Sequence, residues 1–320
     1  MSVNVIMSNA KAVVIAIFNR FGDAMVAAVV ADEFIKKWQD GKRKFFIVTS
    51  PQLLPYVKEI CKTVAVISLK KRNVFSWLNL LFIRYAECAG FDVGFNPYSY
   101  GGESRRIAKM AVWHKLYTNP PRAPFVNYYD RVRAYFGLPP KGDYGLSFSF
   151  PERLRKILIC PESSEARRSL TMGQFIRFVE IMKKEWPEAE ITLATGGSWA
   201  WKGGRVLSLS KTVNSSAQFL AELRQADIVV SVDSGPLHIA AAIGKPVVAL
   251  FSSAHPATVI NQPAMVLPLR AASLCGVYCE VLSCKQPKCM DLLNLTSVWN
   301  ARCEPEHRIV VQEGCPYAGD

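Results

Sequence analysis

Residues 226–251 read ADIVVSVDSGPLHIAAAIGKPVVALF, and their pattern is the clearest indication of the fold in the chain. An apolar run ends at Asp233, and a Ser-Gly pair then turns tightly into a helix of small residues. Pro236 suits the first turn of that helix, where its missing N–H breaks no hydrogen bond. A second apolar run, 247–251, follows the helix. Strand, turn, helix and strand in this order predict a βαβ unit whose parallel strands are buried on both faces.

The same alternation extends from this unit along the whole chain. Apolar runs typical of buried strands lie at 11–18, 44–49, 64–69, 91–95, 156–160, 191–194, 206–209, 228–232 and 247–251. Helical patterns lie between them, at 24–38, 51–61, 74–89, 103–114, 126–136, 172–186 and 237–243, with one more capped by Ser215 or Ser216. A Pro-Pro-Lys-Gly stretch at 139–142 suits a linker. The pattern predicts two doubly wound α/β domains in tandem, 1–145 and 146–320.

The composition is that of a folded protein with a large positive charge. The 320 residues include 39 Lys and Arg against 26 Asp and Glu, a net charge of +13. No apolar run reaches the roughly 18–20 residues of a membrane-spanning helix, and the N-terminus lacks the order of a signal peptide, so we expect a soluble, cytoplasmic protein. The charge would attract nucleic acid, an anionic membrane or a phosphorylated small molecule. No nucleic-acid-binding module is present in the sequence, which argues against nucleic acid as a partner.

The turn after Asp233 has two interpretations. The N–H groups of Ser234, Gly235 and Leu237 would lie at the positive end of a helix and at the carboxyl edge of the sheet, where an anion binds well. His238, one turn further on, would add a donor to that site. Alternatively, Asp233 satisfies its own turn and His238 packs against the other domain.

The stretch SVDSGPLHIAAAIGKPVVALF closely resembles the signature of glycosyltransferase family 9, the ADP-heptose:lipopolysaccharide heptosyltransferases and their relatives. In that family the Asp–Ser/Thr–Gly–x–x–His turn binds the diphosphate of the nucleotide sugar. The resemblance therefore implies that donor binding involves Asp233, Ser234, Gly235 and His238. It also implies a GT-B arrangement, in which two Rossmann-like doubly wound domains face each other across a cleft, the first binding the acceptor and the second the nucleotide sugar.

Two further stretches extend the resemblance. Residues 19–23 resemble the family's Gly-Asp turn, whose aspartate is the proposed general base, and the matching residue is Asp23. Taken alone, Asp23 is better explained as a helix N-cap. Residues 159–168 resemble the first loop of the second domain, where Ser163 and the basic Arg168, or alternatively Arg167, would contact the donor phosphates.

The resemblance thus implies the transfer of a sugar, with inversion, from a nucleoside diphosphate sugar. Heptose is the favoured sugar and ADP-heptose the favoured donor. The reaction would need no metal, and the acceptor would be a glycan such as the lipopolysaccharide core. Most remaining basic clusters fall in the first domain, which favours an anionic glycan or glycolipid acceptor and peripheral attachment to the inner membrane surface. The apolar segment 70–84 with its basic ends would suit such a membrane, but we favour a buried helix of the first domain for it.

The sequence also departs from the family pattern. Glu162 stands where relatives usually have glycine, and no acidic residue follows Gly196 and Gly197, where many relatives contact the ribose. These changes leave open a non-catalytic relative that binds a nucleotide sugar or glycan. A second alternative is a protein-directed heptosyltransferase, because the sequence does not identify the acceptor. A nucleotide-dependent reductase is disfavoured because no G-x-G-x-x-G motif follows the first strand.

Six of the nine cysteines lie near the C-terminus. Four of them lie within fifteen positions, at Cys275, Cys279, Cys284 and Cys289. Their thiolates would suffice for a tetrahedral zinc or iron site. Similar cysteine-bearing segments occur in some relatives, among them the autotransporter heptosyltransferases with a cysteine-bound iron. We expect any metal here to be structural. Cys61, Cys88 and Cys160 are isolated in apolar surroundings and predict small buried side chains.

Overall fold

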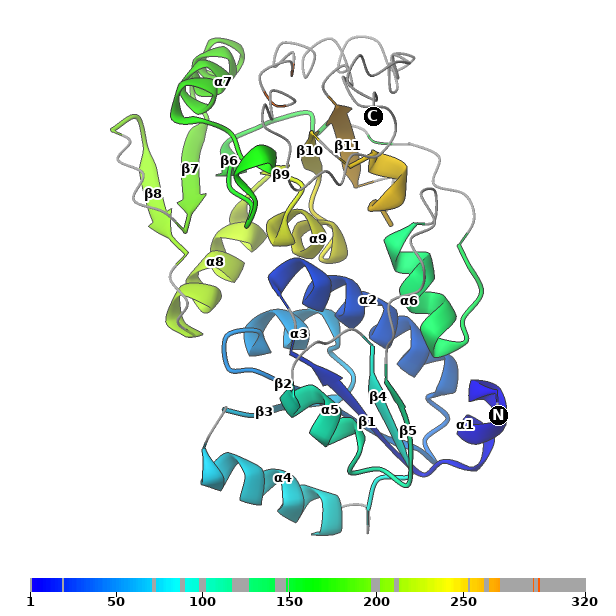
Figure 1. Ribbon diagram of the computed structural model, residues 1–320. Coiled ribbons are helices and arrows are strands. Elements are labelled where there is room, and N and C mark those ends of the chain that lie inside the picture. The colour runs from blue at the N-terminus through cyan, green and yellow to red at the C-terminus, as the bar shows by residue number, and fades with distance from the viewer. Residues whose placement is uncertain are drawn as a thin grey trace, which may run out of the picture. The chain divides into compact units, whose positions relative to one another are not determined.

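The computed structural model describes residues 2–18, 20–70, 73–86, 90–97, 102–116, 127–141, 148, 150–196, 202–209, 213–252, 254–261, 265–270, 290 and 293. The chain divides into two compact units (Figure 1). Unit 1 comprises Met1–Gly142 with Lys211–Ala217, and unit 2 comprises Asp143–Ser210 with Gln218–Asp320. Each unit contains one sheet, so each is described by itself.

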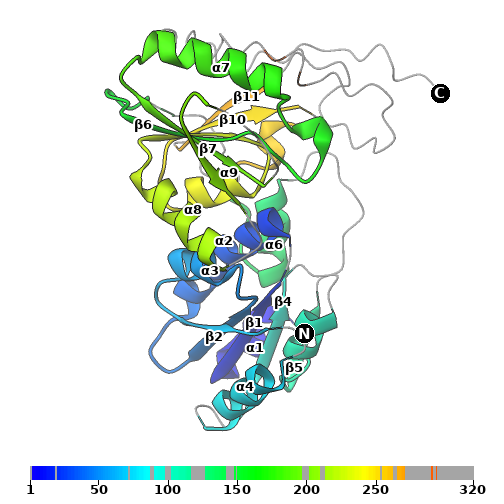
Figure 2. The same cartoon turned by 90° about the vertical axis from the view of Figure 1, so that its left-hand side faces the viewer.

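The sheet of unit 1 is entirely parallel. Its strands, in spatial order, are β3 (Ala65–Ser68), β2 (Lys44–Thr49), β1 (Ala12–Ile17), β4 (Val93–Asn96) and β5 (Trp113–Leu116). The helices are α1 (Val3–Asn9), α2 (Phe21–Trp38), α3 (Leu54–Ile60), α4 (Val74–Ala86), α5 (Gly102–Ala108) and α6 (Tyr128–Phe136). Because the chain order reverses at β1, α4 and α5 cross the face of the sheet opposite to α2 and α3 (Figure 2).

The sheet of unit 2 is parallel as well. Its strands, in spatial order, are β11 (Val266–Arg270), β10 (Val247–Phe251), β9 (Ile228–Val232), β6 (Lys156–Cys160), β7 (Glu190–Thr195) and β8 (Arg205–Ser208). The helices are η1 (Ala166–Arg168), α7 (Met172–Glu185), α9 (Gly235–Ala242), η2 (Pro256–Thr258) and α8 (Val213–Gln225), of which the residues up to Ala217 are assigned to unit 1. Two parallel sheets, each with helices, confirm the predicted α/β class.

In each unit, one aspartate accepts hydrogen bonds from the backbone at the beginning of the first strand of the sheet. In unit 1, Asp92 Oδ2 accepts hydrogen bonds from the backbone N–H groups of Lys11 and Ala12, at 2.7 and 2.9 Å. In unit 2, Asp227 Oδ2 accepts from Arg155 and Lys156 at the same two distances. Each aspartate precedes the strand next to the first strand of its unit, so it satisfies N–H groups that the sheet ladder leaves unpaired.

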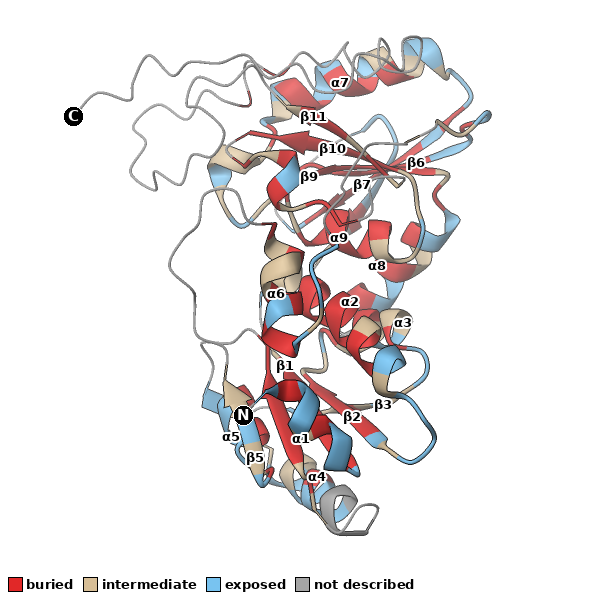
Figure 3. Ribbon diagram, turned by 90° about the vertical axis from the view of Figure 1, so that its right-hand side faces the viewer, coloured by how far each residue is buried: buried red, intermediate tan, exposed pale blue. Residues whose placement is uncertain are grey.

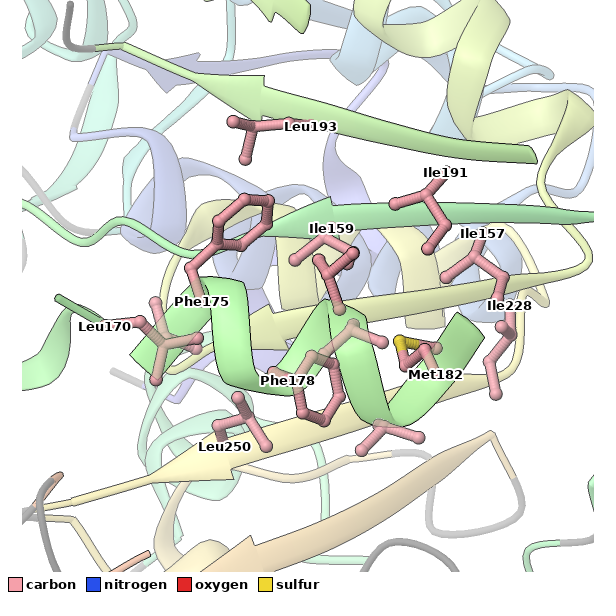
Figure 4. Close-up of a cluster of buried hydrophobic side chains, with 14 of the residues drawn as sticks. Ile157, Ile159, Leu170, Phe175, Phe178, Met182, Ile191, Leu193, Ile228 and Leu250 are labelled. Atoms are coloured by element: carbon pink, nitrogen blue, oxygen red, sulfur yellow. The ribbon is translucent and has the colours of Figure 1, made fainter. Parts of the chain in front are cut away.

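The core of unit 2 lies between α7 and the sheet. Phe175, Phe178 and Met182 of α7 lie against the side chains of β6 and β7, as Figure 4 shows. Thr171 caps this helix through a reciprocal pair of hydrogen bonds with Gln174, which fixes where α7 begins. Packing and capping together fix α7 on this face of the sheet.

Several elements differ from the sequence-based expectations. A short helix, α1, precedes β1, and none of the helical patterns found in the sequence lies there. The helix expected over 103–114 ends at Ala108, and Trp113–Leu116 forms β5 instead. The strand β11 was not predicted at all. A strand of four or five residues has too few positions for its hydrophobic pattern to be distinguished from that of a helix or a loop.

Within the described part of the chain, no helix combines the length and hydropathy needed to cross a bilayer.

Candidate functional site

The turn after β9 lies at the carboxyl edge of the unit 2 sheet. Asp233 follows the strand directly, and its backbone N–H donates to the Leu250 carbonyl oxygen of β10 at 3.2 Å. This bond keeps Asp233 within the sheet, so its carboxylate is at the strand end and nearly buried. α9 begins two residues later and is buried over most of its length (Figure 3).

The Asp233 carboxylate pairs with Arg168, the basic residue predicted to contact the donor phosphates. Arg168 Nη1 donates to Asp233 Oδ2 at 3.0 Å, and Arg168 Nη2 donates to Glu165 Oε1 at 3.3 Å. Glu165 Oε2 in turn accepts from Arg167 Nε at 2.8 Å. The buried Nε of Arg168 has no hydrogen-bond partner among the described residues. Arg168, from another loop, thus provides a hydrogen-bond partner for the Asp233 carboxylate. The alternative, in which the carboxylate bonds within its own turn, is not needed to explain how it is paired.

The first turn of α9 offers backbone donors. Ser234 is the N-cap residue, in an extended conformation, and its side chain makes no capping hydrogen bond. Its Oγ lies 3.4 Å from Ser231 Oγ instead. The N–H of Leu237 donates to the Ser234 carbonyl oxygen at 3.2 Å, so this N–H already has an acceptor within the turn. The N–H groups of Ser234 and Gly235 remain at the positive end of the helix, where a phosphate is favourable.

His238 lies one turn into α9 and is buried. Burial lowers the pKa of its imidazole, and the Arg168 guanidinium acts in the same direction, while the Asp233 carboxylate opposes both. The imidazole is therefore neutral at physiological pH and carries one N–H donor. At an anion site such an imidazole would contribute a hydrogen bond and not a charge.

The loop after β6 is held by hydrogen bonds of its own. The Ser163 N–H donates to Ser169 Oγ at 2.9 Å, which places Ser163 in the same loop as Arg168. Glu162 Oε2 accepts from Thr195 Oγ1 at 2.7 Å and from the Gly196 N–H at 2.6 Å. The acidic residue that departs from the family pattern is thus tied to the end of β7.

In unit 1, Asp23 lies in the first turn of α2. Arg20 is the N-cap residue of this helix, so the N-cap interpretation of Asp23 is wrong. Tyr128 Oη donates to Asp23 Oδ1 at 3.0 Å from the first residue of α6. Since α2 follows β1, the Asp23 carboxylate lies near the carboxyl end of that strand.

A buried amide lies at the same end of the unit 1 sheet. Asn96 is the last residue of β4, and neither polar atom of its side chain has a hydrogen-bond partner among the described residues. Its backbone N–H donates to Tyr135 Oη at 2.9 Å. An unpaired buried amide is costly, so this residue is a candidate for contact with a bound molecule or water.

The four predicted metal ligands, Cys275, Cys279, Cys284 and Cys289, lie outside the described residues. In the part of the chain that is described, no group of three or more His, Cys, Asp or Glu side chains could hold a metal ion. Cys61 and Cys160 are buried and free, as predicted, and burial raises the pKa of both thiols. Cys88 lies outside the described residues.

Three residues near the carboxyl ends of the two sheets were not predicted from the sequence. Glu165 holds both arginines of its loop, Tyr128 contacts Asp23, and the side-chain amide of Asn96 has no partner in the part of the chain that the structure describes. Tyr128 and Asp23 are separated by 105 positions, and no local motif links them. Glu165 does lie beside Arg167 and Arg168 in sequence, so a search for charge pairs within the loop would have found it.

Comparison with known proteins gives both a sequence and a structural match. The model of glycosyltransferase family 9 (heptosyltransferase) matches residues 215–266, which include the whole Asp233 turn. No curated protein matches the chain.

Many solved structures match this chain, and three of them illustrate the shared fold. E. coli ADP-heptose lipopolysaccharide heptosyltransferase II aligns with a TM-score of 0.63 and 13% identity, covering 92% of this chain and 99% of its own. E. coli heptosyltransferase WaaC with ADP gives 0.60 and 14%, covering 90% and 98%. The iron-containing dodecameric glycosyltransferase TibC from enterotoxigenic E. coli gives 0.58 and 13%, covering 92% and 76%. The chain is therefore heptosyltransferase-like in fold and carries the family 9 sequence signature around Asp233.

Proposed function

We propose that this heptosyltransferase-like protein is an inverting glycosyltransferase that moves heptose from a nucleoside diphosphate sugar to a hydroxyl group of an anionic glycan. The observation that carries the proposal is the Arg168–Asp233 pair at the N-terminus of α9, inside the segment that matches family 9. ADP-heptose is the favoured donor because E. coli WaaC, which shares the fold, is described with ADP and with ADP-2-deoxy-2-fluoro heptose.

The residues of unit 2 would hold the leaving diphosphate. When the bond between the anomeric carbon and the diphosphate oxygen breaks, its electron pair passes to that oxygen and negative charge develops there. Arg168 supplies a positive charge, Ser234 and Gly235 supply backbone N–H groups, and His238 supplies one neutral donor. Donors that are already in place when charge develops lower the barrier of such a step.

Asp23 of unit 1 would act as the general base. Its carboxylate takes the proton of the acceptor hydroxyl while the hydroxyl oxygen forms the new bond to the anomeric carbon, on the face opposite to the diphosphate. The configuration at that carbon is thereby inverted. The hydrogen bond from Tyr128 Oη to Asp23 Oδ1 would hold the carboxylate in a fixed orientation for this proton transfer.

An assay with ADP-heptose and truncated lipopolysaccharide core tests the proposal. Asp23→Asn should lower kcat by about 10²- to 10⁴-fold and leave the affinity for ADP, measured by calorimetry, unchanged. Asp40→Asn is the matched control, because Asp40 is a surface carboxylate of the same unit that pairs with Arg43. Full transfer by a folded Asp23→Asn variant would refute the base assignment.

The main alternative is a relative that binds the donor without transferring it. Glu162 favours this alternative, because it brings a carboxylate to the loop of Ser163 and Arg168. Tight ADP-heptose binding without product by mass spectrometry, on glycan and protein acceptors alike, would establish it. Product on a protein acceptor only would identify a protein-directed heptosyltransferase.

The proposed donor and acceptor indicate a subcellular localisation for the protein. A nucleotide sugar is a cytoplasmic metabolite, and a glycolipid acceptor lies in a membrane, so we place the protein in the cytoplasm, at the inner surface of the membrane. The four C-terminal cysteines would hold at most a structural metal in this scheme, and metal independence of the transfer stays a prediction. Transfer that survives a strong chelator would support it.

A further inference from the structure

The α4 helix leaves one apolar face uncovered. The exposed fractions of Phe75, Phe82 and Val74 are 82%, 69% and 68%, and Leu78 and Leu81 are exposed as well. Five large apolar side chains within nine positions of one helix are far more than the scattered exposed residues of an ordinary surface. The expectation that this segment is a buried helix is therefore wrong for this face.

The opposite face of α4 holds the helix on the sheet. Leu80 is fully buried, and the partly buried Trp77 packs against the same cluster. Ile107 and Ala111, from α5 and the residues after it, belong to that cluster too. α4 and α5 therefore lie on the same face of the unit 1 sheet, and Figures 1 and 2 both show them as neighbours.

Basic side chains accompany the apolar face. The stretch 70–86 contains four basic residues and no acidic one, and Lys70 is exposed. On the neighbouring α5 and just after it, Arg105, Arg106 and Lys109 are exposed. Glu103 is the acidic residue of α5. Val112, which follows these residues, is 89% exposed and adds to the apolar side chains.

We infer that this α4–α5 surface, the exposed apolar residues of α4 with Lys70, Arg105, Arg106 and Lys109, docks on an anionic lipid bilayer. An in-plane helix with large apolar residues on one side and basic residues around it has the composition of interfacial membrane-binding helices. The apolar side chains enter the boundary of the acyl chains, and the basic side chains contact anionic headgroups.

Charge disfavours a second copy of this chain as the occupant. A twofold contact would place the same surface on both partners and bring two sets of basic side chains together without acidic partners on α4. An anionic bilayer satisfies the apolar and the basic groups at once.

Flotation of the full chain with vesicles tests the inference, without donor or acceptor, so the result is independent of the proposed reaction. We expect binding to vesicles of phosphatidylethanolamine and phosphatidylglycerol that is weakened by salt, and binding at least about tenfold weaker to phosphatidylcholine vesicles. The double variant Phe75→Ser, Phe82→Ser should lose about tenfold or more in vesicle affinity, and so should Arg105→Glu with Arg106→Glu. Val5→Ser is the matched control, because Val5 is 51% exposed on α1, outside this surface, and it should bind as the unaltered chain does.

All substituted side chains are exposed, so thermal unfolding should stay unchanged and report that the variants are folded. Absence of vesicle binding, or equal binding by the control and both double variants, would overturn the inference. Sedimentation of the unaltered chain as a dimer that the Phe75→Ser, Phe82→Ser variant abolishes would overturn it as well, because a second copy would then cover the surface.

Discussion

Arg168 and Asp233 are 65 positions apart in sequence, yet Arg168 Nη1 lies 3.0 Å from Asp233 Oδ2. The guanidinium comes from the loop after β6 and the carboxylate from the end of β9, and β6 and β9 are paired neighbours in the sheet. The Asp233 side chain is 7% exposed and that of Arg168 is 22% exposed. A carboxylate so poorly solvated needs its partner, so this pair contributes to the stability of unit 2 before any donor binds.

Truncating Arg168 should therefore destabilise the protein. We expect Arg168→Ala to lower the free energy of unfolding by about 1–3 kcal/mol, because it leaves the Asp233 carboxylate without its cation. In a double-mutant cycle with Asp233→Ala, the losses should be non-additive. Arg167→Ala, which breaks the hydrogen bond to Glu165, is the matched control and should cost less. Additive losses for Arg168 and Asp233, measured by urea denaturation, would contradict the coupling.

The buried His238 predicts a pH dependence of stability. Its pKa in the folded protein is lowered from 6.5, so the unfolded chain takes up a proton that the folded chain does not. The free energy of unfolding should be greatest above about pH 6.5 and fall as the pH decreases below that value. Urea denaturation between pH 5 and 8 should show a smaller fall for His238→Gln than for the unaltered chain.

His255 provides a comparison for the fall in unfolding free energy with decreasing pH. Burial and the charge of Arg270 lower its pKa as well, so His255→Gln should also reduce the fall, to a smaller extent because the side chain is only half-buried. If His238→Gln leaves the slope unchanged while His255→Gln removes it, the pH dependence does not come from His238.

The secondary structure around Asp233 could be predicted from the sequence because its signals are strong. The strands Ile228–Val232 and Val247–Phe251 are continuous apolar runs, and Pro236 marks the helix start between them. The side-chain contacts could not be predicted in this way. The Arg168–Asp233 pair depends on β6 lying next to β9, and strand order is a property of the folded sheet that local patterns do not contain.

The error for α4 has a different cause. Its residues are apolar around most of the helix, and such a pattern predicts burial on all sides. Only the position of the helix at the surface of unit 1 shows that Leu80 is covered and Phe75 is not. The residue types of α4 correctly predict an apolar helix. Whether each side chain is buried or exposed depends on neighbours from distant parts of the chain, which the local sequence does not contain.

Glu162 should stabilise unit 2 at some cost to donor affinity. Glu162→Ala removes the acceptor of the Thr195 hydroxyl and the Gly196 N–H, so we expect a loss of about 1–2 kcal/mol in unfolding free energy. Glu162→Gln keeps an acceptor and should lose less. Both variants remove a negative charge from the loop of Ser163 and Arg168, so calorimetry should show a few-fold tighter binding of ADP. Glu190→Gln, at the opposite end of β7, should leave the affinity for ADP unchanged.

Tyr128 should act on the proposed reaction by positioning Asp23. Tyr128→Phe removes the 3.0 Å hydrogen bond to Asp23 Oδ1, and we expect kcat to fall by about tenfold while the KM for the donor stays unchanged. Tyr129→Phe removes a hydroxyl from the next residue of α6 and should retain nearly full kcat. A Tyr128→Phe variant that changes the donor KM but not kcat would show that Tyr128 does not act through Asp23.

Gly94 should be irreplaceable in the sheet of unit 1. A Cβ atom added at this residue of β4 would lie 2.0 Å from the Ala108 carbonyl oxygen, at the end of α5. Because the obstructing atom belongs to the backbone, α5 must move away from the sheet for Gly94→Ala to fold. We expect a loss of about 3 kcal/mol in unfolding free energy, measured by urea denaturation. Gly102→Ala in the same helix meets nothing within 4 Å and should change stability little, so a similar loss in both variants would point to a general sensitivity of α5 instead of the contact with Ala108.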